Sequence, residues 1–506
     1  MPRAEPMSLF RRCFVGAGYS LLGASVHRVL LAAAAIATAR LLGVREFGVY
    51  ANLIAVVNLL MMFGLFGVNT AFSSFLPRAG GPERARQIVA AGVLLVCVLL
   101  AAVFALAWAS ASFVAGALYR SVLTGDHLRT ALPYLAALTL NTLLLSALYG
   151  FQEFRRYSLS MIQLGVLVAA GSVIGVLWGG LRGLLLGGTA AYALNTVFIA
   201  FTLRRLLGAG AAPSWREIRS RARELLAFAL PAFLSGLFLA PAYWLGNMLM
   251  VRAGGSAPSG LFGVANSLAQ LVLFIPATLA ATLVPMFSEV AAHSGRERFS
   301  AFVARNCRMV WCINLPVTVL VGGAAPLLIG ALYGAPYAPS VPAFVLLACS
   351  NLLVAVESVA AYVFIARRRM WEGFALNAIW FLVVLALLAP LVRYGQTGFA
   401  LVLLLAYSVH GVVTLAFLRR HVDLAPLALR AGPAAALTLA AFGLAAWTAL
   451  SRFPTPLVVA LSGAGAAAVA FLEWRYVLDA DDRALVADTL RQRVRREPER
   501  TGGAPR

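Results

Sequence analysis

The stretch "ARLLGVREFGVYANLI", Ala39 to Ile54, decides the fold because it recurs later in the chain. Its echo is "VRAGGSAPSGLFGVANSL", Val251 to Leu268, at an offset of 212 residues. At that offset four positions match in kind: Arg40 with Arg252, Gly43 with Gly255, Gly48 with Gly260, and Tyr50 with Phe262. A second echo joins "YGFQEFRRYS" to "VFIARRRMWE" at nearly the same offset. Two echoes at nearly one offset predict that the chain contains a duplication.

The composition places most of the chain in a membrane. Of its 506 residues, 61% are hydrophobic and 12% are charged, whereas a soluble domain carries about 25% charged residues. Helices that cross a bilayer need about 20 apolar residues, and by this test we predict about fourteen spans. The predicted fold is therefore an all-α polytopic membrane protein with two pseudo-symmetric six-helix bundles plus two C-terminal helices.

The duplication fixes the predicted domain boundaries. A six-helix unit holds an even number of spans, so both copies enter the membrane from the same side, and such parallel repeats frame transport paths. Six prolines predict bent helices at the start of the second half: Pro231, Pro241, Pro276, Pro285, Pro316 and Pro326. The predicted parts are an N-terminal bundle (1–206), a cytoplasmic linker (207–224), a C-terminal bundle (225–420), two further helices (421–476) and a cytoplasmic tail (477–506).

Arginine distribution predicts the orientation. All 41 basic residues are arginines, and the formal net charge is +22. Such a charge is also found in nucleic-acid-binding proteins, but here the arginines concentrate in every second short loop. The positive-inside rule then puts both termini in the cytoplasm, and we expect no nucleic-acid partner. The five cysteines fall mostly inside apolar runs and form no metal-binding spacing.

Charged residues within the predicted spans are the candidate functional groups. "GASVHRVLLAAAA", Gly23 to Ala35, places His27 and Arg28 inside the first span. A central arginine costs about 2.5–3.5 kcal/mol to insert, so Arg28 must face protein or water. It is either a ligand for an anionic group, with His27 beside it, or a structural cation. The small residues on the His27 face suit either a cavity wall or a close helix contact.

Glu357 is the carboxylate that lies clearly inside a predicted span. It is a candidate coupling site for H⁺ or Na⁺, or alternatively a partner of Arg28. Other polar residues in the spans are interpreted as interhelical hydrogen-bonding groups: His410, Asn58, Asn69, Asn141, Asn247, Asn266, Gln270 and Asn377.

The N-terminal motifs resemble those of a known family. "RLLG" (Arg40–Gly43) ends the first predicted span, and "EFG" (Glu46–Gly48) with Tyr50 opens the second. "LYGFQEFRRY" (Leu148–Tyr157) ends the fourth span. This order resembles the polysaccharide transporters of the Wzx type, the O-antigen and exopolysaccharide flippases. They share a superfamily with multidrug-and-toxin exporters and lipid II flippases.

The resemblance implies a function and a site. It implies that the chain is a flippase of the bacterial inner (plasma) membrane that moves an undecaprenyl-pyrophosphate-linked oligosaccharide by alternating access. Glycan polymerase or assembly proteins are the implied partners, and no cofactor is expected beyond a coupling H⁺ or Na⁺. The implied contacts with the anionic headgroup are Arg28, His27, Arg40 and Arg252, although an arginine at a helix end is also a common structural feature.

Other functional classes are less favoured. The sequence shows no P-loop, no HExxH motif and no cluster of membrane aspartates, so an enzyme is not expected. The alternatives are a multidrug or cation antiporter, a lipid II flippase, or a scaffold for glycan assembly. A cation exporter should favour intramembrane carboxylates, whereas a central arginine with a single glutamate favours an anionic substrate.

Overall fold

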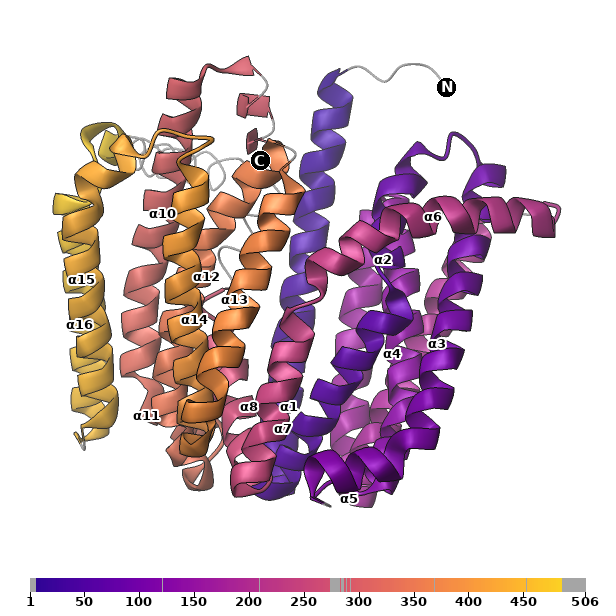
Figure 1. Cartoon of the computed structure of the whole chain (residues 1–506), viewed down its shortest axis with the longest axis horizontal. Coiled ribbons are helices and arrows are strands. Elements are labelled where there is room, and N and C mark those ends of the chain that lie inside the picture. The colour runs from indigo at the N-terminus through magenta and orange to yellow at the C-terminus, as the bar shows by residue number, and fades with distance from the viewer. Residues whose placement is uncertain are drawn as a thin grey trace, which may run out of the picture. The chain divides into compact units, whose positions relative to one another are not determined.

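The computed structural model describes residues 6–120, 122–208, 210–273, 283, 286–287, 289–291, 293–367, 369–451 and 453–484. Helices make up the ordered elements of these ranges, and no strand occurs among them (Figure 1). The first helices are α1 (Pro6–Leu65), α2 (Val68–Phe75), η1 (Leu76–Arg78), α3 (Pro82–Tyr119), α4 (Gly125–Gly150), α5 (Phe154–Leu207), α6 (Trp215–Gly236), α7 (Leu239–Gly254) and α8 (Ala257–Ala269). The later helices are α10 (Arg296–Gly323), α11 (Ala325–Leu332), η2 (Ala335–Ser340), α12 (Val341–Ala366), α13 (Met370–Leu391), η3 (Val392–Tyr394), α14 (Gly395–Leu418), α15 (Ala425–Leu450) and α16 (Thr455–Tyr476).

The helices are long and apolar enough to cross a membrane, as predicted. Within the described ranges eight stretches qualify as spans, or ten if two bent helix pairs are included. Three of the eight have 48, 54 and 49 residues, far more than the roughly 20 that one crossing needs. Each of the three is interrupted at glycine: at Gly43, at Gly179 and Gly180, and at Gly395. The all-α polytopic fold is confirmed, whereas the number fourteen stays a prediction. The predicted span 259–287 extends partly outside the described residues.

Two of the predicted bends are present. The helix pair around residues 235–238, α6 and α7, is bent by 49°, and the pair α10 and α11 is bent by 61°. The second break lies beside Pro326, whereas Pro316 sits inside continuous α10. Pro276 and Pro285 lie outside the described residues. Both observed spans bend, but only the second break lies at a predicted proline, because Pro231 lies inside α6 and Pro241 inside α7.

The duplication is visible in the backbone. Gly43 has φ 74° and ψ 171°, and its counterpart Gly255 has φ 76° and ψ −165°. Only glycine adopts this left-handed region without strain, so both copies break a helix in the same way. The next matched pair, Gly48 and Gly260, packs reciprocally. A Cβ on Gly48 would lie 1.9 Å from the Ser256 carbonyl oxygen, and one on Gly260 would lie 2.3 Å from that of Val44.

This contact supports the internal symmetry. Val44 and Ser256 are separated by the same 212 residues as the two glycines, so the residues that touch are themselves equivalent positions. A contact between equivalent surfaces is what a two-fold related pair produces. The contact is therefore what two pseudo-symmetric copies predict, whereas their extent as six-helix bundles stays a prediction.

The chain divides into two compact units, which we describe separately. The first unit comprises Met1–Leu268, Ile329–Ala343 and Asn377–Ala406, and the second comprises Ala269–Leu328, Phe344–Leu376 and Tyr407–Arg506. The predicted domain boundaries (1–206, 207–224, 225–420, 421–476 and 477–506) stay a prediction. The second half of the predicted linker is helical, because a capping box between Ser214 and Glu217 starts α6 there.

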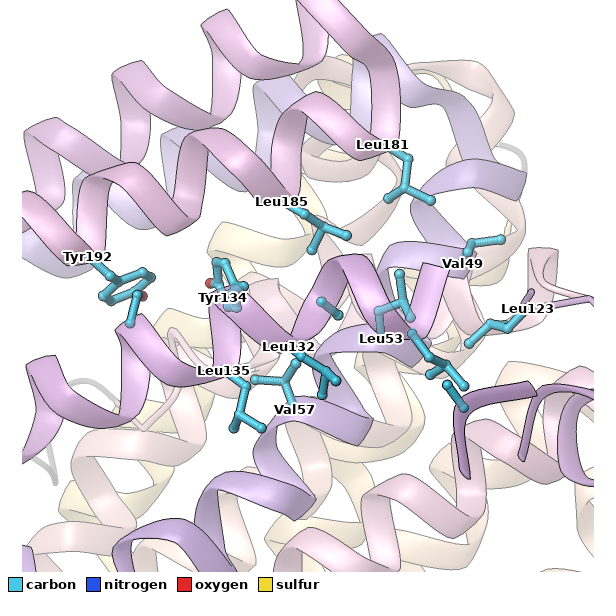
Figure 2. Packing of buried hydrophobic residues seen from close by; sticks show 14 of the residues in the cluster. Val49, Leu53, Val57, Leu123, Leu132, Tyr134, Leu135, Leu181, Leu185 and Tyr192 are labelled. Atoms are coloured by element: carbon cyan, nitrogen blue, oxygen red, sulfur yellow. The ribbon is translucent and has the colours of Figure 1, made fainter. Parts of the chain in front are cut away.

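The core of the first unit lies where α1, α4 and α5 meet. Val49, Leu53 and Val57 recur every four residues on the second arm of α1, so they share one face of the helix. They are buried in one cluster with Leu181 and Leu185 of α5 (Figure 2). In the same unit, α6 packs against α2 and α3 (Figure 1). In the second unit, α15 and α16 lie side by side and pack against α10 (Figure 1).

Candidate functional site

A buried acid–base pair lies in the second unit. Glu357 on α12 and His410 on α14 meet with 2.6 Å between Oε2 and Nδ1. Each side chain is 14% exposed. Both helices are apolar over most of their length, so a carboxylate there would be costly without a partner. The pairing of the two residues removes much of that cost.

The environment of the pair is apolar and tightly packed. Apolar residues of α12, including Val356 and Val359, belong to a hydrophobic cluster that also contains Val413 of α14. A Cβ on Gly411 would lie 2.9 Å from the Glu357 Oε1 atom, so the glycine makes room for the carboxylate. Oε1 itself is buried and has no hydrogen-bond partner within the described ranges. The site therefore holds a carboxylate oxygen with spare capacity to bind a proton.

His27 and Arg28 point in different directions from the first arm of α1. His27 is only 8% exposed, and a Cβ on Gly165 of α5 would lie 3.2 Å from its Cα atom. Gly23, one turn earlier, packs still more closely, because a Cβ there would lie 2.6 Å from the Ser158 Cα atom. The small-residue face of this helix is thus a close contact with α5. Arg28 is exposed, so its guanidinium is accessible, whereas His27 lies in the helix contact.

Arg40 and Arg252 both lie at helix ends, next to the glycine breaks. Arg40 is exposed and donates from Nη2 to the carbonyl oxygen of Ala331. The backbone carbonyl of Arg252 accepts from Nη1 of Arg120 at 3.5 Å. Arg28 and Arg40 are twelve residues apart on one helix arm, which corresponds to about 18 Å. The two arginines therefore define separate positions along α1, and the structure does not bring them together.

Sequence reasoning missed an ionic cluster at one end of α10. Arg308 contacts Asp479 at 2.6 Å and Asp482 at 2.7 Å, and Arg305 contacts Asp482 at 2.9 Å. Asp482 is fully buried. Burial by itself would raise the pKa of the Asp482 carboxyl, but hydrogen bonds from Arg308 and Arg305 hold that pKa below its usual range. The cluster ties the chain segment after α16 to α10.

A second intramembrane carboxylate was also missed. Glu473, near the end of α16, is 1% exposed, and neither of its oxygens has a hydrogen-bond partner by distance and angle within the described residues. It lies close to Cys312 of α10. The predicted span 455–474 contains Glu473 at its margin, so the sequence alone placed it at the membrane surface. Within the described ranges, no group of three or more His, Cys, Asp or Glu residues is arranged to hold a metal ion.

Comparison with known proteins gives the family. A family model described as "Polysaccharide biosynthesis protein" matches residues 37–342, which is more than half of the chain. The chain is 28% identical over 422 residues to the EPS I polysaccharide export inner membrane protein EpsE of Ralstonia solanacearum, covering 80% of this chain and 94% of that protein. The EpsE of Ralstonia nicotianae is 27% identical over 420 residues, covering 78% of this chain and 92% of that protein.

Solved structures give the fold class. The lipid II flippase MurJ in an inward closed conformation aligns with a TM-score of 0.71 at 12% identity, covering 90% of this chain and 99% of that one. A multidrug resistance MATE family transporter of the MOP superfamily, inward-facing, aligns with a TM-score of 0.67 at 16% identity, covering 79% and 97%. The family model and the solved structures point to the same kind of membrane protein. The chain belongs to the polysaccharide biosynthesis protein family and has the fold of MOP-superfamily transporters.

Proposed function

We propose that the protein is a flippase that moves a lipid-linked oligosaccharide across the bacterial plasma membrane by alternating access. The substrate we infer is a polysaccharide repeat unit on undecaprenyl pyrophosphate. The family match, the EpsE relatives named as polysaccharide export proteins and the fold shared with a lipid II flippase support this function. We further infer that both termini lie in the cytoplasm, because arginines concentrate in the loops of that side.

The observation that carries the proposal is the exposed guanidinium of Arg28 within an apolar helix. Its insertion cost of about 2.5–3.5 kcal/mol is offset when the group meets an anion. A guanidinium binds phosphate oxygens through paired hydrogen bonds, so a diphosphate headgroup is a suitable ligand. Arg40 and Arg252 are further candidate contacts at the outer helix ends, and His27 supports the position of the α1 arm.

The test substitutes Arg28 in a strain that lacks its own exporter. Arg28→Ala should insert at the wild-type level yet lose export, because hydrogen bonds to a charged group contribute about 1.5–3 kcal/mol each, or roughly tenfold to hundredfold in binding. Arg28→Lys should retain partial export, since lysine keeps the charge without the paired geometry. Arg204→Ala, at an exposed arginine near the end of α5, is the matched control.

Surface polysaccharide, measured against the amount of protein in the membrane, is the readout. Export by Arg28→Ala at the level of Arg204→Ala would overturn the assignment of Arg28 as the headgroup ligand. The fold is also that of multidrug exporters, so the same strains should be tested for resistance to cationic dyes. Dye resistance conferred by the wild type, with no effect on polysaccharide, would favour the antiporter.

A further inference from the structure

We infer that Glu357 and His410 form a single proton-binding site and that the ion coupled to transport is H⁺. The inference rests on the proposed transport function and adds the identity of the ion and the second residue of its site. The supporting observations are the short contact between the two side chains, their burial, and the spare carboxylate oxygen.

The contact itself requires a hydrogen on one of the two atoms. A carboxylate oxygen and an unprotonated imidazole nitrogen are both hydrogen-bond acceptors, so they do not attract one another. A distance of 2.6 Å between Oε2 and Nδ1 is that of a charge-assisted hydrogen bond. The contact therefore needs a hydrogen on Nδ1 or on Oε2. A neutral His410 with its hydrogen on Nδ1 satisfies the contact with a net charge of −1 on the pair. One further proton, which makes His410 cationic or Glu357 neutral, brings the pair to zero net charge.

Burial favours the state that holds this further proton. With it the pair carries no net charge, whereas without it the pair keeps a net charge of −1 in apolar surroundings. An uncompensated charge there is expensive, so proton release requires that water reach the site. The pair can therefore release its proton to water when the site opens and must regain one before the site closes. This dependence is what couples proton movement to a conformational change.

The site is poorly suited to a metal cation. Hard cations such as Ca²⁺ and Mg²⁺ take roughly six or more oxygen ligands in proteins, and the same preference for oxygen applies to Na⁺. Here the imidazole nitrogen occupies one carboxylate oxygen. Within the described ranges no group of three or more His, Cys, Asp or Glu residues could hold a metal ion.

Other titratable and charged groups on the packed helices have their own partners or lie farther away. The Tyr407 ring is 6.4 Å from the His410 ring, edge to face. Arg367 lies over the Phe299 ring and is ten residues beyond Glu357, or about 15 Å along α12. Glu372 at the start of α13 pairs with His421, which follows α14, and Cys307 of α10 packs in the apolar cluster.

The chain offers a matched control for this site. Glu372 and His421 form a second glutamate–histidine pair at 2.8 Å, with side chains 20% and 12% exposed. That pair lies at the start of α13 and after the end of α14, so it has the same chemistry but sits at the helix ends. Glu372→Gln and His421→Gln therefore test whether any such pair would give the same result.

The first experiment detects proton binding without transport. The purified full-length protein in liposomes is stepped between pH values, and the carboxyl stretching band is followed by infrared difference spectroscopy. Among the carboxyl bands that titrate, we expect one that is absent in Glu357→Gln, displaced in His410→Gln and retained in Glu372→Gln. A wild-type spectrum unchanged in Glu357→Gln would overturn the proton site.

The second experiment identifies the coupling ion. Liposomes containing the protein and a fluorescent undecaprenyl-pyrophosphate-linked sugar are given a pH gradient or a sodium gradient. We expect only the pH gradient to drive accumulation, and we expect Glu357→Gln and His410→Gln to lower it about tenfold, because a charge-assisted hydrogen bond is lost. Both variants should elute from size-exclusion chromatography as the wild type does, which shows that they are folded.

Each outcome distinguishes the two proposals. Accumulation driven by sodium alone, or full pH-gradient dependence in Glu357→Gln, contradicts the proton site. If the wild type moves no sugar lipid under any gradient, the proposed transport function fails, while the infrared titration still decides whether the pair binds a proton. Loss of pH-gradient dependence in the Glu372→Gln control would contradict the assignment to Glu357.

Discussion

Single residues differ in how far the sequence predicts their roles. Glu357 was identified because a carboxylate inside a span is rare and costly. Its partner, His410, was interpreted only as an interhelical hydrogen-bonding group, because the pairing depends on which helices are neighbours and how they are rotated. The two residues are separated by 53 positions, and no local periodicity links them. Arg28 was likewise recognised from its depth, but its exposure required the structure.

A substitution at Gly48 tests the symmetric contact at the residue scale. Gly48→Ala should lower the melting temperature of the purified protein, because the new Cβ would lie 1.9 Å from the Ser256 carbonyl oxygen. Gly116→Ala in α3, where nothing lies within 4 Å, is the control. Helix propensity alone favours alanine by about 1 kcal/mol at both positions, whereas overpacking costs about 1–3 kcal/mol. A melting temperature of Gly48→Ala equal to or above that of Gly116→Ala would contradict the close contact.

At the scale of elements, sequence reasoning predicted the helices but not their attachments. Apolar length predicts spans, and matched glycines predict that both copies break alike, because these signals are local. The segment after α16 was predicted as part of a cytoplasmic tail, but Asp479 and Asp482 fasten it to α10. Arg308 lies 174 residues before Asp482. The sequence does not show which of two such distant charged segments will pair in the folded chain.

The ionic cluster yields a stability prediction for α10 and α16. Arg308→Ala should destabilise the second unit by about 1.5–3 kcal/mol, because the buried carboxylate of Asp482 loses one of its two arginine partners and keeps only Arg305. Asp481→Asn is the control, since that neighbouring carboxylate is 85% exposed and 3.9 Å from Arg305, and it should change little. Thermal unfolding monitored by tryptophan fluorescence measures both. Equal melting temperatures for the two variants would show that the cluster does not hold the segment.

The same cluster has a defined pH dependence. The pKa of Asp482 is lower in the folded chain than its usual value, which is about 3.9, so the unfolded chain binds more protons between the two values. The stabilisation is therefore fully present above about pH 4 and is lost as the pH falls through the lower, folded pKa. Unfolding midpoints of the wild type and Asp482→Asn, measured from pH 7 to pH 3, should converge only below about pH 4. Equal unfolding midpoints of the two proteins already at pH 6 would contradict the pairing of Asp482 with the arginines.

At the scale of the whole molecule, composition and duplication together predicted the fold class. High hydropathy indicates a membrane protein, and two echoes at offsets of 212 and about 214 indicate repeated halves. Equivalent glycines in one contact and the fit to MOP-superfamily transporters agree with both conclusions. The fold does not predict the substrate, because proteins of this fold include a lipid II flippase and a multidrug resistance transporter, and fold does not determine function.

The central claim is that this protein moves a lipid-linked oligosaccharide from one leaflet to the other. The most direct measurement reconstitutes the wild-type chain in liposomes with an undecaprenyl-pyrophosphate-linked oligosaccharide and follows the fraction of sugar accessible to an added glycosidase. We predict that accessibility rises with time under a pH gradient for the wild type, and that it stays at the level of empty liposomes for Arg28→Ala. If the fraction of accessible sugar rises no faster with the wild-type protein than in liposomes without protein, the claim that this chain moves the lipid-linked oligosaccharide is wrong.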